Sequence, residues 1–169
     1  MCAFYAIIEV RMKKFRAYLE TSVWNFLYTE DAPDKREKTK EFFQSLSTGE
    51  YEIFVSDVVF QEIDAAPVEK RRQLMEVITR CDPVVLLQDH AAVTLAREYA
   101  KAGVLSNKHY LDLLHLAIAT TNRLNMIVSW NMKHIVKRKT QIFVNATNAM
   151  AGYSDLEIWT PQEMIDDED

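Results

Sequence analysis

The stretch FRAYLETSVWNFL, residues Phe15–Leu27, decides the fold. Its first five residues, Phe15–Leu19, form a short, largely apolar run that ends abruptly in a carboxylate, Glu20. Two hydroxyl residues, Thr21 and Ser22, follow, and a new apolar pattern begins after them. A short apolar run with polar borders predicts a buried strand, and the pattern that follows it predicts a helix. The acidic residue at this junction needs a physical reason.

The composition predicts one globular domain. The chain has 169 residues, of which 49% are hydrophobic, and only three are glycine and four proline. These numbers allow one sizeable core and disfavour an all-β fold with many tight turns. The two cysteines, Cys2 and Cys81, do not have metal-ligand spacing, and we expect no disulfide framework. No apolar run reaches the roughly 20 residues of a membrane span, and we read no signal peptide, so we expect a cytoplasmic protein without a membrane partner.

Strand-like and helix-like segments alternate along the chain. Five short apolar runs predict strands, at 15–19, 51–56, 83–87, 126–130 and 157–159. The segments between and after them have helical periodicity, most clearly at 34–46, 68–80, 89–103, 106–124 and 160–165. Such alternation predicts an α/β fold in which helices cover both faces of a parallel sheet of about five strands. The functional site of such a sheet lies beyond the carboxyl ends of its strands.

Three acidic residues interrupt the apolar pattern. Glu20 ends the first strand, Glu62 shares a helix stripe with Val58 and Val59, and Asp112 falls in the second turn expected for the most apolar helix. A buried carboxylate without a partner is costly, so each residue needs an ion pair or a cavity. One interpretation is a set of unrelated ion pairs. The other is a single oxygen-lined pocket for a hard cation such as Mg²⁺, in which the three carboxylates converge.

Four motifs extend this interpretation: YLETSVWNFL, VSDVVFQEI, KHYLDLLHLAIAT and IVSWNMKHI. Their order and spacing, together with the tail TPQEMI, resemble PIN-domain ribonucleases, most closely the VapC-type branch, over about residues 12–165. The resemblance implies a three-layer α/β/α sandwich and an endoribonuclease that depends on Mg²⁺ or Mn²⁺. It also implies an RNA substrate and a small antitoxin that holds the enzyme inactive, and it leaves a homodimer open.

The resemblance also assigns roles to single residues. Glu20, Glu62 and Asp112 match the metal-binding acids of the family, and Glu20 stands where many members have aspartate. Asn131 matches the catalytic position after the fourth strand, where many members also have aspartate. These two departures leave one metal ion plausible and place a second in doubt. The resemblance assigns the neighbouring hydroxyl pair, Thr21 and Ser22, to substrate phosphate or metal-bound water.

A basic run, KHIVKRK, follows Asn131 directly. The net charge is -5, so contact with a polyanion would have to rely on such a local patch. We expect a helix here, and its cations are either a solvated helix face or a phosphate-binding surface; they are Lys133, Lys137, Arg138 and Lys139. We expect two nearby histidines, His115 and His134, to be packing residues rather than ligands.

An alternative function stays open at this point. The missing fourth acid and the acidic net charge are compatible with a non-catalytic PIN-like module that binds RNA or a partner protein. Met12 falls where chains of the family usually begin, so residues 1–11 are expected to form an N-terminal extension. The nuclease-like domain is then expected over 12–165, with an acidic tail at 166–169.

Overall fold

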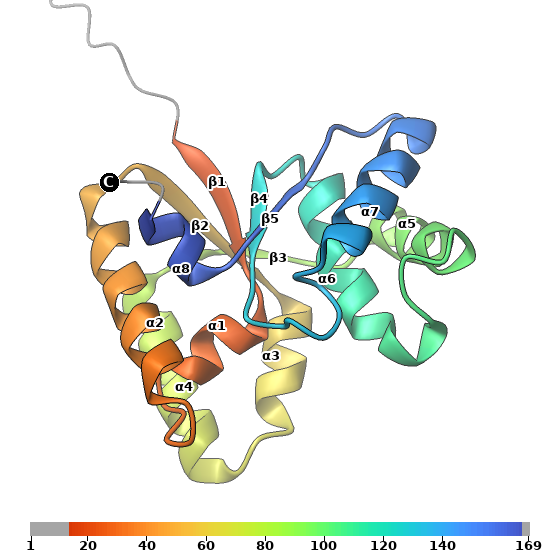
Figure 1. Ribbon diagram of the computed structural model, residues 1–169. Coiled ribbons are helices and arrows are strands. Elements are labelled where there is room, and N and C mark those ends of the chain that lie inside the picture. The colour runs from red at the N-terminus through yellow and green to blue at the C-terminus, as the bar shows by residue number, and fades with distance from the viewer. Residues whose placement is uncertain (1–13, 167–169) are drawn as a thin grey trace, which may run out of the picture.

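The computed structural model describes residues 14–166, so the expected extension at 1–11 and the tail residues 167–169 lie outside the described residues. One five-stranded sheet has the order β3-β2-β1-β4-β5, and every neighbouring pair in it is parallel. Figure 1 shows the sheet at the centre of the molecule. The strands are β1 (Phe15–Leu19), β2 (Tyr51–Ser56), β3 (Val84–Leu86), β4 (Met126–Val128) and β5 (Glu157–Trp159).

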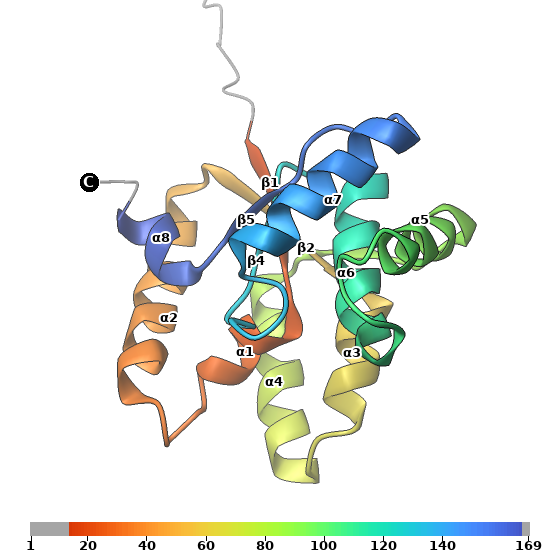
Figure 2. The ribbon, with the colours of Figure 1, turned by 45° about the vertical axis from the view of Figure 1, so that its right-hand side comes forward.

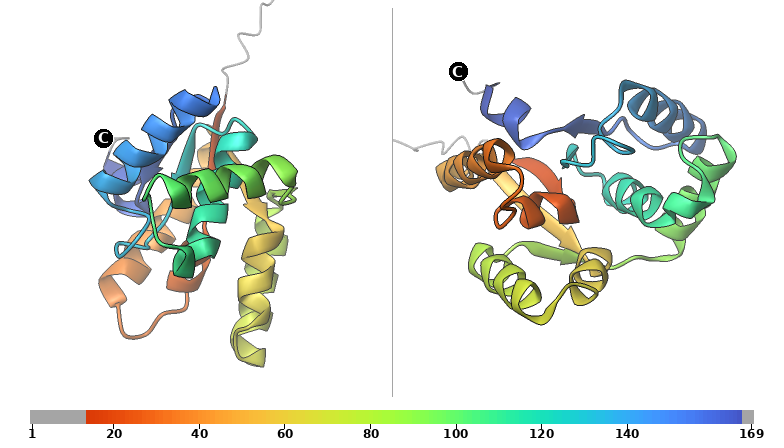
Figure 3. Two further views of the ribbon diagram at one scale, coloured as in Figure 1. Left: turned by 90° about the vertical axis from the view of Figure 1, so that its right-hand side faces the viewer. Right: turned by 60° about the horizontal axis from the view of Figure 1, so that its bottom comes forward.

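Helices cover the sheet on both sides (Figures 1 and 3). One layer holds α1 (Thr21–Phe26), α2 (Pro33–Ser45), α4 (Val68–Cys81) and α8 (Pro161–Asp166). The opposite layer holds α5 (His90–Lys101), α6 (Tyr110–Thr121) and α7 (Arg138–Ala151), while α3 (Asp57–Asp64) extends β2 beyond its carboxyl end. Two 3₁₀ turns, η1 (Leu46–Thr48) and η2 (Asn107–His109), complete the described elements. The predicted three-layer α/β/α fold is therefore confirmed.

Local sequence explains most element boundaries. Strands β1, β2 and β5 occupy the predicted ranges, and the last three residues of both β1 and β2 are buried. At the start of α8, the backbone N–H of Thr160 donates to Glu163 Oε2 (2.7 Å), and the N–H of Glu163 donates to Thr160 Oγ1 (3.1 Å). This reciprocal pair is the capping box that the tail sequence predicts. Between residues 14 and 166, no helix is long and apolar enough to cross a membrane.

Two local predictions are wrong. The helix expected over the basic run is a loop at 131–137, and α7 begins only at Arg138. Within that loop, the N–H of His134 donates to Asn131 Oδ1 (3.1 Å), and Thr140 Oγ1 donates to the His134 carbonyl (2.6 Å). Such side-chain bonds compete with helical hydrogen bonds. Helix α6 begins at Tyr110, later than expected, so Asp112 lies in its first turn rather than its second.

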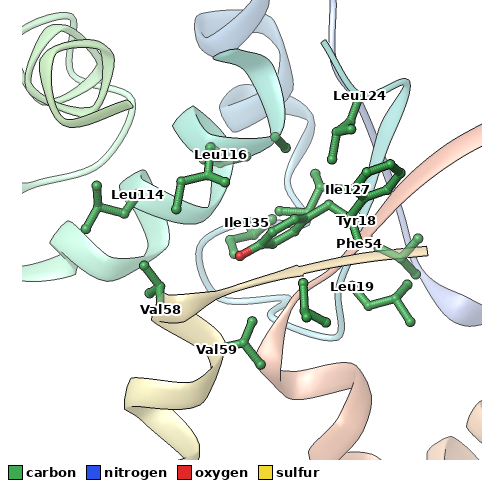
Figure 4. Packing of buried hydrophobic residues seen from close by; sticks show 14 of the residues in the cluster. Tyr18, Leu19, Phe54, Val58, Val59, Leu114, Leu116, Leu124, Ile127 and Ile135 are labelled. Carbon is green, nitrogen blue, oxygen red and sulfur yellow. The ribbon is translucent and has the colours of Figure 1, made fainter. Parts of the chain in front are cut away.

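The core lies between the sheet and its helices. Figure 4 shows Tyr18 of β1 and Ile127 of β4 close to Leu116 of α6 and Ile135 of the loop after β4. All four side chains are inaccessible to solvent. The loop after β4 is therefore anchored in the core by an apolar residue.

Replacing Ile127 should test how strongly β4 depends on this packing. Ile127→Ala removes a fully buried side chain and leaves a cavity, so the free energy of unfolding should fall by about 2–5 kcal/mol. Ile142→Ala, at a position that is 55% exposed, is the matched control and should change stability by less than about 0.5 kcal/mol. Urea denaturation would measure both, and equal effects would contradict the assigned core.

Candidate metal centre at the carboxyl ends of the strands

Polar side chains gather where β1, β2 and β4 end. Glu20 follows β1 directly, and its backbone N–H donates to the carbonyl of Val128 at the end of β4 (3.1 Å). After β4, the chain continues through Ser129 into the loop that carries Asn131. This loop lies between α1 and α6 (Figure 2). Because parallel strands present their carboxyl ends at one edge, segments far apart in sequence meet here.

Glu20 is nearly buried, with 5% of its surface exposed. Its Oε2 accepts hydrogen bonds from the hydroxyls of Ser22 and Ser129, the second at 2.8 Å. Ser22 is fixed in turn, because its oxygen accepts from the N–H of Trp130 (2.8 Å). Burial raises the pKa of Glu20 above its ordinary value, while the charge of His115 and the two hydroxyl donors act in the opposite direction. Ionised Glu20 is therefore an incompletely compensated buried charge.

Glu62 comes from α3 and is held by two donors. Its Oε2 accepts from the hydroxyl of Thr21 and lies 2.8 Å from Nε2 of His115. His115 is fully buried, and its Nδ1 lies 2.7 Å from the hydroxyl of Tyr18. That hydroxyl is 2.6 Å from Ser56 Oγ. A hydrogen-bonded chain from β2 through β1 and α6 thus sets the orientation of Glu62.

Glu62 and His115 favour each other's charged form. Burial would raise the pKa of Glu62, but the hydrogen bond and charge of His115, with the bond from Thr21, bring it below its ordinary value. Burial would lower the pKa of His115, but the hydrogen bond to Glu62 and the charges of Glu20 and Glu62 bring it above its ordinary value. His115 therefore keeps Glu62 ionised, and its Nε2–H donates to the carboxylate.

Glu20, Glu62 and His115 form a first group, in which the two carboxylates are the candidate ligands because both nitrogens of His115 are engaged in hydrogen bonds. One ligand atom from each lies within 4.8 Å of the others. Among the described residues, no hydrogen bond reaches the second oxygen, Oε1, of either carboxylate. Two carboxylates with uncommitted oxygens suit a hard cation such as Mg²⁺ or Mn²⁺. The donor set of this group therefore fits the ion that the sequence resemblance implies.

Asp112 lies in a second group. Its Oδ1 accepts from the amide Nδ2 of Asn131 (3.0 Å), and its Oδ2 lies 2.9 Å from Nδ1 of His134 and 3.9 Å from Nδ1 of His109. Burial raises the pKa of Asp112, the charges of His134 and His115 oppose this, and the charge of Glu62 adds to it. The structure thus divides the three predicted carboxylates between two neighbouring groups of ligand atoms, and a shared cation remains a prediction.

The remaining predicted residues surround these groups. Thr21 and Ser22 use their hydroxyls to hold Glu62 and Glu20, so in this structure they position carboxylates. Their contact with substrate stays a prediction. The cations of the basic run are exposed on the loop that carries Asn131 and on the first turn of α7; they are Lys133, Lys137, Arg138 and Lys139. Their contact with phosphate also stays a prediction.

Sequence reasoning missed the contribution of histidine. His115 and His134 were expected to be packing residues, but each contacts a carboxylate. His109 was not among the predicted site residues. The signal for two of them was spacing, because His109, Asp112 and His115 recur at intervals of three, which brings side chains to one side of a helix. No spacing rule could place His134, which approaches from a different segment.

Removing the charge of Glu20 should stabilise the metal-free protein. A carboxyl group whose pKa is raised on folding binds its proton more tightly in the folded state, so its ionisation lowers stability as pH rises from the ordinary value of 4.5 through the raised pKa. Glu20→Gln should therefore increase the free energy of unfolding at pH 7 in chelator, and this gain should vanish below about pH 4.5.

The exposed residue Glu30 supplies the control, since Glu30→Gln makes the same chemical change where water solvates the charge. Denaturant titrations at pH 4 and pH 7 would compare the three proteins. A Glu20→Gln variant less stable than wild type at both pH values would identify the carboxylate as a required acceptor for Ser22 and Ser129.

Comparison with known proteins supports the fold. No protein-family model matches the chain, and no curated protein matches it. Among solved structures, it resembles VapBC2 from Rickettsia felis, determined bound to a DNA fragment from the promoter, with 14% identity over 86% of this chain and 98% of that chain and a TM-score of 0.52. A tyrosyl-tRNA synthetase from Archaeoglobus fulgidus, complexed with L-tyrosine, has 12% identity over 87% and 55% of the two chains, but its TM-score of 0.44 is too low to indicate a shared fold. The chain has a PIN-like fold with a candidate acidic metal site.

Proposed function

We propose that this protein is a Mg²⁺- or Mn²⁺-dependent endoribonuclease that hydrolyses RNA phosphodiester bonds. One observation carries the proposal: Glu20 and Glu62 meet at the carboxyl ends of the central strands, one of them nearly buried. His115 compensates only one of the two carboxylates, and a bound cation would compensate the other. A PIN-like fold that tolerates this incomplete compensation is consistent with a metal-dependent site.

Glu20 and Glu62 would hold the ion, with Asp112 as the third predicted ligand and Asn131 beside it. A bound Mg²⁺ or Mn²⁺ would polarise the scissile phosphate and supply an activated water. Ser22 and Ser129 fix one oxygen of Glu20 and leave the other for a ligand.

The remaining polar contacts hold the other acids. His115 keeps Glu62 ionised and oriented through its Nε2–H. The amide of Asn131 donates to Asp112 and fixes one oxygen of that carboxylate. Asn131 therefore positions an acid in this structure, although it stands where many PIN-domain proteins carry one.

The RNA backbone would lie along the basic loop and the start of α7. The net charge of -5 should repel a polyanion overall, so local cations have to supply the attraction. Lys133 and Lys137 are exposed on the same loop as Asn131, which connects the cation cluster to the acidic groups.

We also propose a toxin role in the cytoplasm, with a small antitoxin as partner. The support is the fold shared with VapBC2, together with the VapC-type motifs of the sequence. Co-purification with a small protein encoded beside this one would test the pairing. Sedimentation of the isolated chain would test whether it forms a homodimer.

Metal binding should stabilise the folded protein. At a Mg²⁺ or Mn²⁺ concentration of 100 Kd, linkage predicts a gain of about 2.7 kcal/mol, which thermal unfolding would detect. Glu62→Gln and Asp112→Asn should each reduce this gain and lower RNA cleavage by at least about 10–100-fold, the loss typical even for partners of ligands.

Asp64→Asn is the matched control, since Asp64 lies exposed on the same helix as Glu62. It should leave both the metal response and cleavage unchanged. A protein that shows no metal response and cuts no RNA with either ion would instead be the non-catalytic module.

RNA binding should depend on salt through the basic cluster. Replacing Lys137, Arg138 and Lys139 together with alanine should flatten the log–log salt dependence of affinity, by about 0.7 for each phosphate of single-stranded RNA that these cations neutralise. The weakening should be similar across RNA sequences and smaller for cleavage at saturating RNA.

A second triple variant controls for net charge. Alanine at Lys70, Arg71 and Arg72 also removes three positive charges, but from α4. Its salt slope should equal that of wild type. If both triple variants give the same slope as wild type, the RNA binds elsewhere.

A further inference from the structure

Two histidines and an aspartate from different segments face one another beside the first acidic group. His109 ends η2, Asp112 lies in the first turn of α6, and His134 belongs to the loop after β4. One ligand atom from each lies within 4.8 Å of the others, and the two imidazole rings have centroids 3.7 Å apart. All three side chains are partly exposed, at 26%, 16% and 28% respectively, so an ion can reach them from solvent.

The separations suit one small transition-metal ion. In a tetrahedral site with bonds of about 2.0–2.1 Å, ligand atoms lie roughly 3.3 Å apart. The Nδ1 atoms of His134 and His109 lie 2.9 and 3.9 Å from Asp112 Oδ2, values on either side of that distance. Small side-chain adjustments would equalise them. Three protein ligands would leave a coordination position open for water.

Neighbouring hydrogen bonds hold the ligands in place. Asn131 Nδ2 donates to Asp112 Oδ1, which leaves Oδ2 facing the two rings. Asn131 Oδ1 accepts from the backbone of His134, and Thr140 Oγ1 donates to the His134 carbonyl. One asparagine thus fixes a ligand from α6 and a ligand from the loop. Hydrogen bonds that orient the ligands in this way are typical of metal sites in proteins.

We infer that His109, Asp112 and His134 form a binding site for a transition-metal ion of the Zn²⁺ or Co²⁺ class, which shares Asp112 with the proposed Mg²⁺ or Mn²⁺ site and is otherwise separate from the Glu20–Glu62 group. Imidazole nitrogen is a good ligand for such ions, whereas Mg²⁺ prefers oxygen. The inference concerns binding alone, so it holds whether or not the protein cleaves RNA.

Cobalt provides a direct readout. Titration of the metal-free protein with Co²⁺, on a background in which Cys2 and Cys81 are serine, should produce visible d–d absorption with one strongly bound ion. His109→Gln and His134→Gln should each weaken Co²⁺ affinity by more than about 10–100-fold, since loss of an outer partner already costs that much. Asn131→Ala should weaken Co²⁺ affinity by about 10–100-fold. Competition with Zn²⁺ should abolish the absorption.

Two further variants make the test decisive. His90→Gln removes an exposed histidine at the start of α5 and should leave Co²⁺ affinity unchanged. Glu62→Gln should also retain the absorption, because Glu62 belongs to the other group. Circular dichroism would confirm that each variant is folded. The inference is overturned if wild type binds no Co²⁺, if the His109→Gln and His134→Gln variants bind it as tightly as wild type, or if Glu62→Gln abolishes the absorption.

Discussion

β1 pairs with β2 along one edge and with β4 along the other, and the acidic site depends on this double pairing. It brings the carboxyl ends of three strands together, so that Glu20, the start of α3 and the loop after β4 share one small region. The hydrogen bond from Glu20 N–H to the Val128 carbonyl continues the β1–β4 ladder one residue beyond the strand. The backbone of Glu20 is therefore part of the sheet, while its side chain belongs to the site.

Burial of charge at this edge is balanced by many weak donors rather than by lysine or arginine. Hydroxyl groups of serine and threonine hold both glutamates, and one buried histidine, His115, supplies the only close positive charge to Glu62 among the described residues. Hydroxyl donors stabilise a carboxylate without neutralising it. Since His115 alone among the described residues faces the two glutamates as a cation, the pair keeps an excess of negative charge. Such an excess is what attracts and holds a cation.

Apolar runs predicted the sheet well, and the signal has a clear cause in β1, β2 and β4, because a strand whose residues are buried on both faces leaves a continuous apolar run in the sequence. The glutamates could be noticed for the opposite reason, as charges in places where burial is costly. Helix α7 was missed because its sequence is mixed, with polar residues such as Asn145 and Asn148 turned to partners inside the protein. The contact between His134 and Asp112 could not be predicted, since His134 reaches Asp112 through a loop whose path depends on Ile135 being buried in the core. Tertiary packing, not local pattern, decides that contact.

The long chain separation within the site has a consequence for synthesis on the ribosome. Glu20 and its donor Ser129 are 109 residues apart, and β4 cannot join β1 until most of the domain has emerged. Such non-local pairings form late, because the chain must lose the entropy of closing a long loop before the contacts between its ends can stabilise it. A nascent chain that ends before β4 would carry Glu20 and Glu62 without the loop that completes their surroundings. The acidic centre therefore assembles only after β4 and the loop that follows it have left the ribosome.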